Sequence, residues 1–452
     1  MEKLQVNGIL LLYHHFIAPN APTIMEHINA IKSLSSFHVW SINTELGIPP
    51  NLRDLDFKII ILHYSIFGSY PYMLDKDFYS FLSNSKNSWK IAFFQDEYYR
   101  CEERFKFIND FGINCIYTLL EPQYFKDFYL KYTKVDTIVY NIPSYVSDDL
   151  IKLGKQITKS ELEKKIDIGY RGRKIPWFYT GKGAQEKTEI AIYFSDYSQT
   201  LDLKIDISTE ENKRIYGNAW YEFLAECRAV LGVEAGVSIM DIHGLVRKEC
   251  EKLIEVNPQM TFEEVHDKLL YQWENNIPYR TIGPRHFEAA ALKTCQILFE
   301  GNYSGILLPM VHYIPLKKDF SNFDSVISMF RNPEIRSQLV DNAYNDLIIS
   351  GKYTYKQFVV EFDNKLIDYG LKPYISPGKI IQVNKLINGG NLFFKLTIKL
   401  KNLKKVNSPL RIYRNLRIRY YPAPIKDILY SKFIFVFKFV DNVIRIIVGE
   451  KK

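Results

Sequence analysis

The sequence lacks the features of a fibrous, disulfide-stabilised or membrane-spanning protein. Its 22 glycines and 19 prolines among 452 residues are too few for a collagen-like or low-complexity chain. The five cysteines are odd in number, contain no C-x-x-C pair and stand in no zinc-like cluster with histidines, so we expect reduced thiols and no metal site. No uninterrupted apolar run reaches about 18 residues, so we expect no transmembrane helix.

We also expect no secretory leader at the N-terminus. Only the short apolar run Ile9–Tyr13 follows Glu2 and Lys3, and it is too brief for a signal peptide. Together with the unpaired cysteines, this pattern predicts a cytoplasmic protein.

Excess positive charge is confined to the end of the chain. Residues Lys385–Lys452 hold 16 Lys and Arg but only 3 Asp and Glu, which leaves 43 basic and 48 acidic residues for residues 1–384, a net charge of −5. The overall charge of +8 therefore says little about the body of the protein, and we expect no nucleic-acid binding.

The hydrophobic pattern predicts an α/β protein with two domains and an extension. Short β-branched and aromatic runs alternate with helical stretches, and the nearly continuous apolar run Lys58–His63 is typical of a parallel strand covered on both faces. Two such series predict tandem doubly wound, Rossmann-like domains at residues 1–150 and 165–375, followed by an extension at 376–452. We expect the carboxyl ends of both sheets to face a cleft that holds ligands.

The most informative stretch is Gly283–Ala291, which reads Gly-Pro-Arg-His-Phe-Glu-Ala-Ala-Ala. Proline favours the first helical turn, so a helix is predicted to begin near Pro284 and to offer its free N–H groups, with Arg285, to a phosphate. Glu288 has two acceptor oxygens for the hydroxyls of a ribose. An alternative is that Arg285 and Glu288 only form an ion pair at a helix start.

A second basic turn follows the predicted strand at residues 166–170. The sequence Tyr-Arg-Gly-Arg over 170–173 combines a glycine turn with two cations, and Lys182 and Lys187 follow. Glycine lets the backbone approach a phosphate, and the cations supply charge. The same pattern is also typical of a solvated basic loop.

Polar residues after two strands of the first domain are candidates for a general base. His14 and His15 follow the first strand, and Asp96 and Glu97 follow the strand predicted at Trp89–Gln95. An acceptor hydroxyl needs such a base if the reaction inverts a stereocentre. Histidines at strand ends can equally be structural, and a pair of acids can cap a helix.

Three segments resemble the donor-binding half of bacterial group 1 glycosyltransferases of the GT-B fold. These segments are Tyr279–Thr294, Ile297–Ile306 and His312–Asn322, whereas residues 1–145 are similar in architecture only. The resemblance implies transfer of a sugar from a nucleotide-sugar donor, without a bound metal or cofactor. It implies a glycan or lipid-linked glycan acceptor in bacterial envelope polysaccharide synthesis.

The resemblance also implies roles for single residues. Glu288 takes the position of the acid that binds the nucleotide ribose. The diphosphate candidates are Arg285, Arg171 and Arg173, with Lys187 and Lys182 as second choices. Candidate contacts to the donor sugar or phosphates are Glu234, Ser238, Asp241, Tyr303, Ser304 and Gly305. Ser238 or Asp241 can alternatively cap the helix that follows.

One position departs from the family pattern. Arg280 stands eight residues before Glu288, where many retaining members carry a second glutamate. A guanidinium cannot replace a carboxylate beside a developing oxocarbenium ion, but it can neutralise a leaving diphosphate. The sequence therefore leaves retention or inversion open.

The basic extension predicts contact with a membrane surface. Lys438, Asp441, Asn442 and Arg445 share one helical face in an otherwise apolar, Phe-rich segment, which is typical of an amphipathic interfacial helix. We expect residues 385–452 to dock on the anionic inner face of the plasma membrane. The alternatives are that the extension packs across the two domains or mediates self-association.

Two other functions fit the same architecture. A polyol-phosphate transferase of teichoic-acid type would transfer a phosphopolyol and release a nucleoside monophosphate, whereas sugar transfer releases a diphosphate. A two-lobed ligand-binding protein without enzymatic activity is the other alternative.

Overall fold

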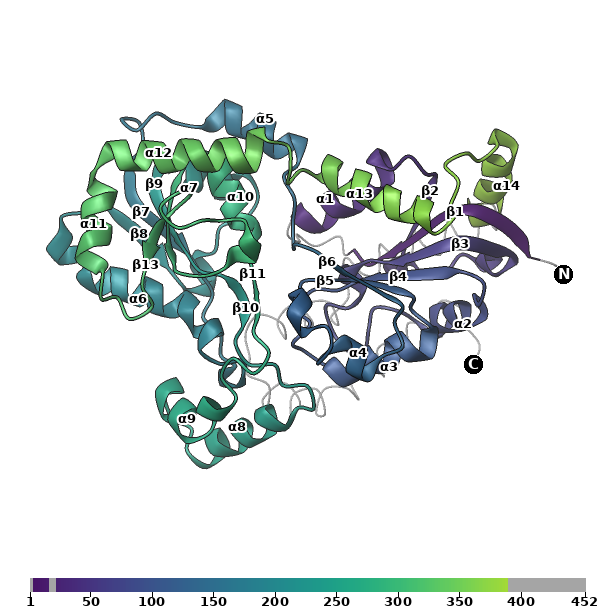
Figure 1. Cartoon of the computed structure of the whole chain (residues 1–452), viewed down its shortest axis with the longest axis horizontal. Coiled ribbons are helices and arrows are strands. Elements are labelled where there is room, and N and C mark those ends of the chain that lie inside the picture. Colours follow the sequence, from purple (N-terminus) through teal and green to yellow (C-terminus); the bar gives the residue numbers. More distant parts are fainter. Residues whose placement is uncertain (1–2, 16–21, 389–452) are drawn as a thin grey trace, which may run out of the picture. The chain divides into compact units, whose positions relative to one another are not determined.

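A computed structural model describes residues 3–15 and 22–388, and it contains two parallel β-sheets (Figure 1). The first sheet has the strand order β2-β1-β3-β4-β5-β6, and all its neighbouring strands are parallel. Its strands are β1 (Leu4–Tyr13), β2 (Val39–Asn43), β3 (Leu55–Leu62), β4 (Trp89–Phe93), β5 (Cys115–Thr118) and β6 (Thr137–Tyr140).

Polar residues set the ends of the helices that follow these strands. The Asp75 carboxylate accepts from the first N–H groups of α2, the Ser147 hydroxyl accepts from α5, and Gly112 ends α3 in the left-handed region. The helices are α1 (Pro22–Leu34), α2 (Lys76–Asn84), α3 (Cys101–Phe111), α4 (Tyr129–Tyr132) and α5 (Asp148–Ile157).

The second sheet has the order β13-β12-β9-β7-β8 and is also parallel. Its strands are β7 (Ile166–Arg171), β8 (Ile205–Ser208), β9 (Cys227–Gly232), β12 (Cys295–Phe299) and β13 (Ile314–Leu316). A separate antiparallel pair joins β10 (Ala235–Val237) to β11 (Tyr279–Thr281). The helices are α6 (Lys182–Leu201), α7 (Asn218–Glu226), α8 (Leu245–Val256), α9 (Phe262–Lys268), α10 (Pro284–Ala291), α11 (Phe323–Arg331) and α12 (Pro333–Tyr344).

Alternation along β9 shows how both faces of this sheet are covered. Ala229 and Leu231 belong to a core that includes residues of α6 and α11. Val230, between them, belongs to another core, with residues of α7 and α10. Because the inner strands β9 and β12 are buried on both faces, near-continuous apolar runs form them. The prediction of two tandem doubly wound parallel sheets is confirmed.

Two helices pack beyond the residue ranges predicted for the domains. The buried residues of α13 (Tyr355–Asp368), including Phe358 and Phe362, lie in the core of the first sheet with Ile61 and Phe93. Leu150 of α5 lies in a core with residues of α10. The predicted range 165–375 thus contains a helix that completes the first core, because the apolar face of α13 matches that sheet. The last described helix is α14 (Pro377–Asn388).

The strand order places a switch point between β7 and β9. From β7 the chain passes to the edge strand β8 on one side and then returns to β9 on the other. Connections that leave in opposite directions open a crevice at the carboxyl ends of the two strands, where ligands bind in such sheets.

Within the described ranges, no helix is long and apolar enough to cross a bilayer. The predicted membrane-docking segment 385–452 lies almost entirely outside the described residues, since only its first four residues are described.

The close packing of α5 on α10 yields a test of the fold. A Cβ built on Gly154 would lie 2.5 Å from the backbone oxygen of Ala291, so the backbones must part to admit a methyl group. We expect Gly154→Ala to lower the free energy of unfolding by about 1–3 kcal/mol in urea titrations. Gly68→Ala, where nothing lies within 4 Å, should change it by less than about 0.5 kcal/mol. Equal effects of the two substitutions would contradict the packing.

Candidate functional site

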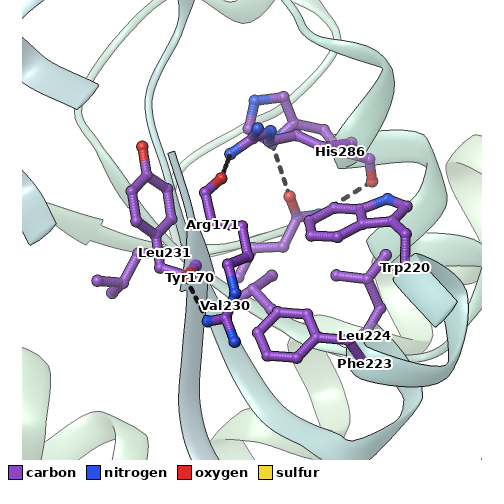
Figure 2. Close-up of a pocket in the computed structure, with 10 residues that line it drawn as sticks. Tyr170, Arg171, Trp220, Phe223, Leu224, Val230, Leu231 and His286 are labelled. Carbon is purple, nitrogen blue, oxygen red and sulfur yellow. Dashed lines mark hydrogen bonds between the residues drawn. The ribbon is translucent and has the colours of Figure 1, made fainter. Parts of the chain in front are cut away.

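A pocket lies at the switch point of the second sheet. Figure 2 shows the aromatic side chains of Tyr170, Trp220 and Phe223 around Arg171. The lining residues come from β7, α7, β9, α10 and β12, and they are Tyr170, Arg171, Trp220, Phe223, Leu224, Val230, Leu231, Arg285, His286 and Gln296. Strand ends and one helix start therefore converge on a mainly apolar recess.

Helix α10 begins beside this pocket, at the residue that the sequence predicts. Gly283 is its N-cap and provides no side-chain cap, and Pro284 is its first helical residue. A helix start without a side-chain cap leaves its positive dipole end for an anion.

The Glu288 carboxylate is fixed by a tryptophan. Trp220 Nε1 donates to Glu288 Oε2 at 2.7 Å. Burial raises the pKa of Glu288, while the Trp220 hydrogen bond and nearby Arg285 lower it. The described residues contain no ion pair between Arg285 and Glu288, the alternative that the sequence leaves open. Arg285 Nη1 instead donates to the backbone oxygen of Arg171 at 3.1 Å. Glu288 is thus a half-buried, oriented acceptor.

Two cations crowd the same region. The guanidinium of Arg285 lies 5.7 Å from the ring centre of Tyr170 and 5.8 Å from that of Trp220. Burial, reinforced by Arg285 and Arg280, lowers the pKa of Lys187 to about 8, and Asp96 and Glu186 oppose this shift. An anionic ligand relieves such crowding of like charges.

Arg171 is committed to the protein itself. Its guanidinium pairs with Asp206 at 2.8 Å, donates to the backbone oxygens of Tyr170, Asp206 and Lys213, and stacks on Phe223 at 4.5 Å. Arg173 is exposed and does not line the pocket. Among the cations predicted for the diphosphate, Arg285 and Lys187 instead lie close enough for their charges to act on each other.

Arg280 is also held by protein acceptors. It donates to Glu186, to the backbone oxygen of Gly183 at 2.6 Å and to Glu234 Oε2 at 3.4 Å. Lys182, in contrast, is exposed at the start of α6, and its N–H faces the carboxylate of Glu274.

The three candidates of the segment 232–241 each hold a neighbouring element. Glu234 Oε1 accepts from the N–H of Tyr303 at 2.9 Å. Ser238 Oγ accepts from the N–H of Gly183 at 2.8 Å and so caps α6, not the helix that follows it. The Asp241 carboxylate accepts from the N–H groups of Val246 and Arg247 in the first turn of α8, as the capping alternative describes.

The loop after β12 has an unusual backbone. Tyr303, Ser304 and Gly305 have φ values of 46°, 58° and 70°, in the left-handed region. The buried Tyr303 hydroxyl donates to Phe299 O at 2.7 Å, and Ser304 Oγ accepts from the N–H of Ile282 at 3.2 Å. Three successive left-handed residues persist only where surrounding contacts hold them.

The four base candidates differ in their surroundings. Glu97 is 0% exposed and accepts from Thr118, Tyr129, Tyr279 and the N–H of Leu119, so its lone pairs are occupied. His14 is buried beside Thr44 and Glu45. The backbone N–H of His15 donates to Asn43 at 3.0 Å.

Asp96 is the most exposed of the four base candidates, and His15 is half-buried. Asp96 adopts a left-handed φ of 50° and accepts from the Tyr98 hydroxyl at 3.4 Å. Enclosure by surrounding protein atoms raises the pKa of Asp96, and Lys187 opposes the shift. Within the described part of the chain, no three His, Cys, Asp or Glu side chains gather as metal ligands.

Sequence reasoning missed three residues that shape this site. Trp220 and Tyr170 stand in apolar stretches that are typical of core positions, and Glu186 stands on a charged helix. No local signal separates them from ordinary packing or surface residues.

Comparison with known proteins gives distant structural similarity only. No family model matches the sequence, and no curated protein matches it. S. aureus TarM is 14% identical with a TM-score of 0.36, and the match covers 69% of this chain but only 54% of TarM. Anabaena HepE in complex with UDP is 8% identical with a TM-score of 0.44, covering 80% of this chain and 100% of HepE. A glycosyltransferase from Rickettsia africae is 12% identical with a TM-score of 0.41, covering 81% and 99%.

These values are too low to transfer a substrate or a mechanism to this chain. The fold therefore rests on the two strand orders, and the function rests on the chemistry of the site.

Charge crowding around Lys187 gives a prediction. Arg285→Gln should raise the pKa of Lys187 above about 8, because it removes a neighbouring positive charge. The ¹³C chemical shift of the Lys187 side chain, followed against pH by NMR, measures this. Arg173→Gln, which removes an exposed cation, should leave the titration unchanged. An identical Lys187 titration in Arg285→Gln and the unsubstituted protein would contradict the assignment.

Proposed function

We propose that this protein is a nucleotide-sugar-dependent glycosyltransferase that binds its donor at the carboxyl ends of β7 and β9. The observation that carries the proposal is an oriented carboxylate, Glu288, that shares the start of α10 with Arg285, while Lys187 of α6 lies close enough for the charge of Arg285 to lower its pKa. A nucleoside diphosphate offers hydroxyl donors and negative charge in matching positions.

Glu288 supports binding of the ribose. A carboxylate oxygen accepts more than one hydrogen bond, so Trp220 can fix the carboxylate while ribose hydroxyls donate to it. Such donors favour the charged form and offset the effect of burial on the pKa of Glu288. The aromatic walls Trp220, Phe223 and Tyr170 suit the flat face of a base or ribose.

Arg285, Lys187 and the start of α10 would then bind the diphosphate. The guanidinium groups of Arg171 and Arg280 donate to protein oxygens. Arg285 and Lys187 are therefore the cations that we propose to stabilise negative charge on the departing diphosphate. Stabilisation of that leaving group, together with positioning of the two substrates, is the main catalytic contribution that we propose.

On the acceptor side we propose Asp96 as the general base. Its side chain is the most exposed of the four candidates, and the charge of Lys187 acts on it. His14 and Glu97 are less suited, because protein groups surround their side chains, and His15 is less exposed than Asp96. The proposal also includes a hexosyl donor group and a glycan or lipid-linked glycan acceptor. It places the protein in envelope polysaccharide synthesis, in the cytoplasm at the inner membrane face.

Ligand-dependent melting tests the ribose role. The full chain should gain thermal stability from one nucleoside diphosphate and its sugar derivative in a panel, with about 2.7 kcal/mol expected at 100 times the dissociation constant. Glu288→Ala should lose this gain, whereas Glu334→Ala, an exposed acid in the first turn of α12, should keep it. Equal gains in Glu288→Ala and the unsubstituted protein would remove the ribose assignment. Release of a nucleoside monophosphate during turnover would instead favour phosphopolyol transfer.

The depressed pKa of Lys187 predicts how donor binding depends on pH. Nucleoside-diphosphate affinity should fall by up to tenfold per pH unit above about pH 8, because Lys187 then loses the proton that pairs with phosphate. Isothermal titration calorimetry between about pH 7.5 and 9.5 measures this. Lys187→Met should bind more weakly and without the decline, whereas Lys182→Met should retain it. A decline that persists in Lys187→Met would assign the titration to another group.

A further inference from the structure

Four charged side chains form a connected group behind the loop after β12, which we call the Arg280 network: Arg280, Glu186, Glu234 and Lys318. Arg280 pairs with both carboxylates, and Lys318 Nζ lies 2.8 Å from Glu186 Oε1. The side chains of Arg280, Glu186 and Glu234 are only 12%, 5% and 6% exposed. The formal charges sum to zero, so the network is balanced within the protein.

The network holds Arg280 on protein acceptors. Three of its five N–H donors are used, since its Nη1, Nη2 and Nε groups donate to Gly183 O, Glu186 Oε2 and Glu234 Oε2. These bonds fix the buried guanidinium on its partners, through which Arg280 can act on a bound donor.

Glu234 is the partner that reaches the loop Gly301–Gly305. One of its oxygens pairs with Arg280, and the other accepts from the N–H of Tyr303 at 2.9 Å. The loop also packs directly on this carboxylate, since a Cβ built on Gly301 would lie 2.6 Å from Glu234 Oε2. A side chain at position 301 would thus displace the Glu234 carboxylate.

The loop needs such support, because Tyr303, Ser304 and Gly305 are all left-handed. β11 and the residue after it supply the support from two sides. Arg280 acts through Glu234, while Thr281 Oγ1 lies 3.0 Å from Ser304 Oγ and the N–H of Ile282 donates to the same hydroxyl. Loss of one support leaves a strained segment free to relax.

We propose that Arg280 is a positioning residue that fixes the loop Gly301–Gly305 through Glu234, and that this loop orients the sugar of the donor. The inference rests on the proposed function, because only a bound nucleotide sugar gives the loop a sugar to orient. It replaces the direct diphosphate contact predicted for Arg280. Binding of the nucleoside diphosphate itself belongs to Glu288, Arg285 and Lys187 and does not depend on the network.

A comparison of nucleotide-sugar binding with nucleoside-diphosphate binding separates these roles. We would titrate the full chain with UDP, GDP, ADP and dTDP and with their glucose derivatives by calorimetry. In Arg280→Met and Glu234→Gln, the dissociation constant of the nucleoside diphosphate should change less than threefold. That of the nucleotide sugar should rise at least tenfold. Gly301→Ala should reproduce this pattern without changing any charge, because its methyl group displaces Glu234.

Arg336 and Glu161 provide a matched control. Arg336 is a buried arginine of α12 that is not part of the network and is paired with Glu161 at 2.9 Å. Arg336→Met and Glu161→Gln should leave both dissociation constants within threefold, whatever they do to the melting temperature.

Three results would overturn the inference. If the dissociation constant of the nucleoside diphosphate rises tenfold in Arg280→Met, Arg280 is a direct phosphate ligand. Unchanged nucleotide-sugar binding in Glu234→Gln and Gly301→Ala would remove the role of the loop. The same selective loss in Arg336→Met would make the effect one of general stability. If the unsubstituted protein binds no member of the panel, the proposed function itself fails.

Discussion

The hydrogen bond from Trp220 to Glu288 is the interaction on which the site depends. It fixes an acidic side chain one turn inside α10, at a point where the carboxyl ends of β7 and β9 open a crevice. A carboxylate in this position is costly to bury, and it is kept oriented by a single donor that an aromatic wall of the pocket supplies. The rest of the site follows from where α10 begins, since Pro284 and Arg285 stand at its exposed dipole end.

The positive side chains around this point divide into two kinds. Arg171 and Arg280 satisfy protein oxygens and hold β7, α6 and the loop after β12 in place. Lys187 instead lies half-buried near Arg285, and burial together with the charge of Arg285 lowers the pKa of Lys187. Physical chemistry thus separates cations that build the site from cations suited to an anionic ligand, although all four look alike in the sequence.

The sequence predicts most of the elements, because local patterns determine them. The apolar run around Ile61 predicts a strand covered on both faces, and Pro284 predicts the first residue of α10. The strands β10 and β11 escape prediction, since three residues each are too few to show a period. The predicted domain ranges place helix α13 with the second sheet, although it packs on the first, because nothing in its sequence says which sheet its apolar face meets.

The site was predictable where one helix carries it and not where distant residues pair. Glu288 and Arg285 share a helix start, so their proximity follows from spacing alone. Arg280 meets Glu186 across 94 residues, and Tyr279 reaches Glu97 across 182. Such partners decide whether a charged residue is available to a ligand, and only the folded chain brings them together.

The most direct test of this account is a crystal structure of the full chain soaked with the nucleotide sugar that it binds most tightly. The account predicts both ribose hydroxyls within hydrogen-bonding distance of the Glu288 carboxylate and the diphosphate at the start of α10. A nucleotide seated elsewhere, with Glu288 bonded only to Trp220, would contradict it.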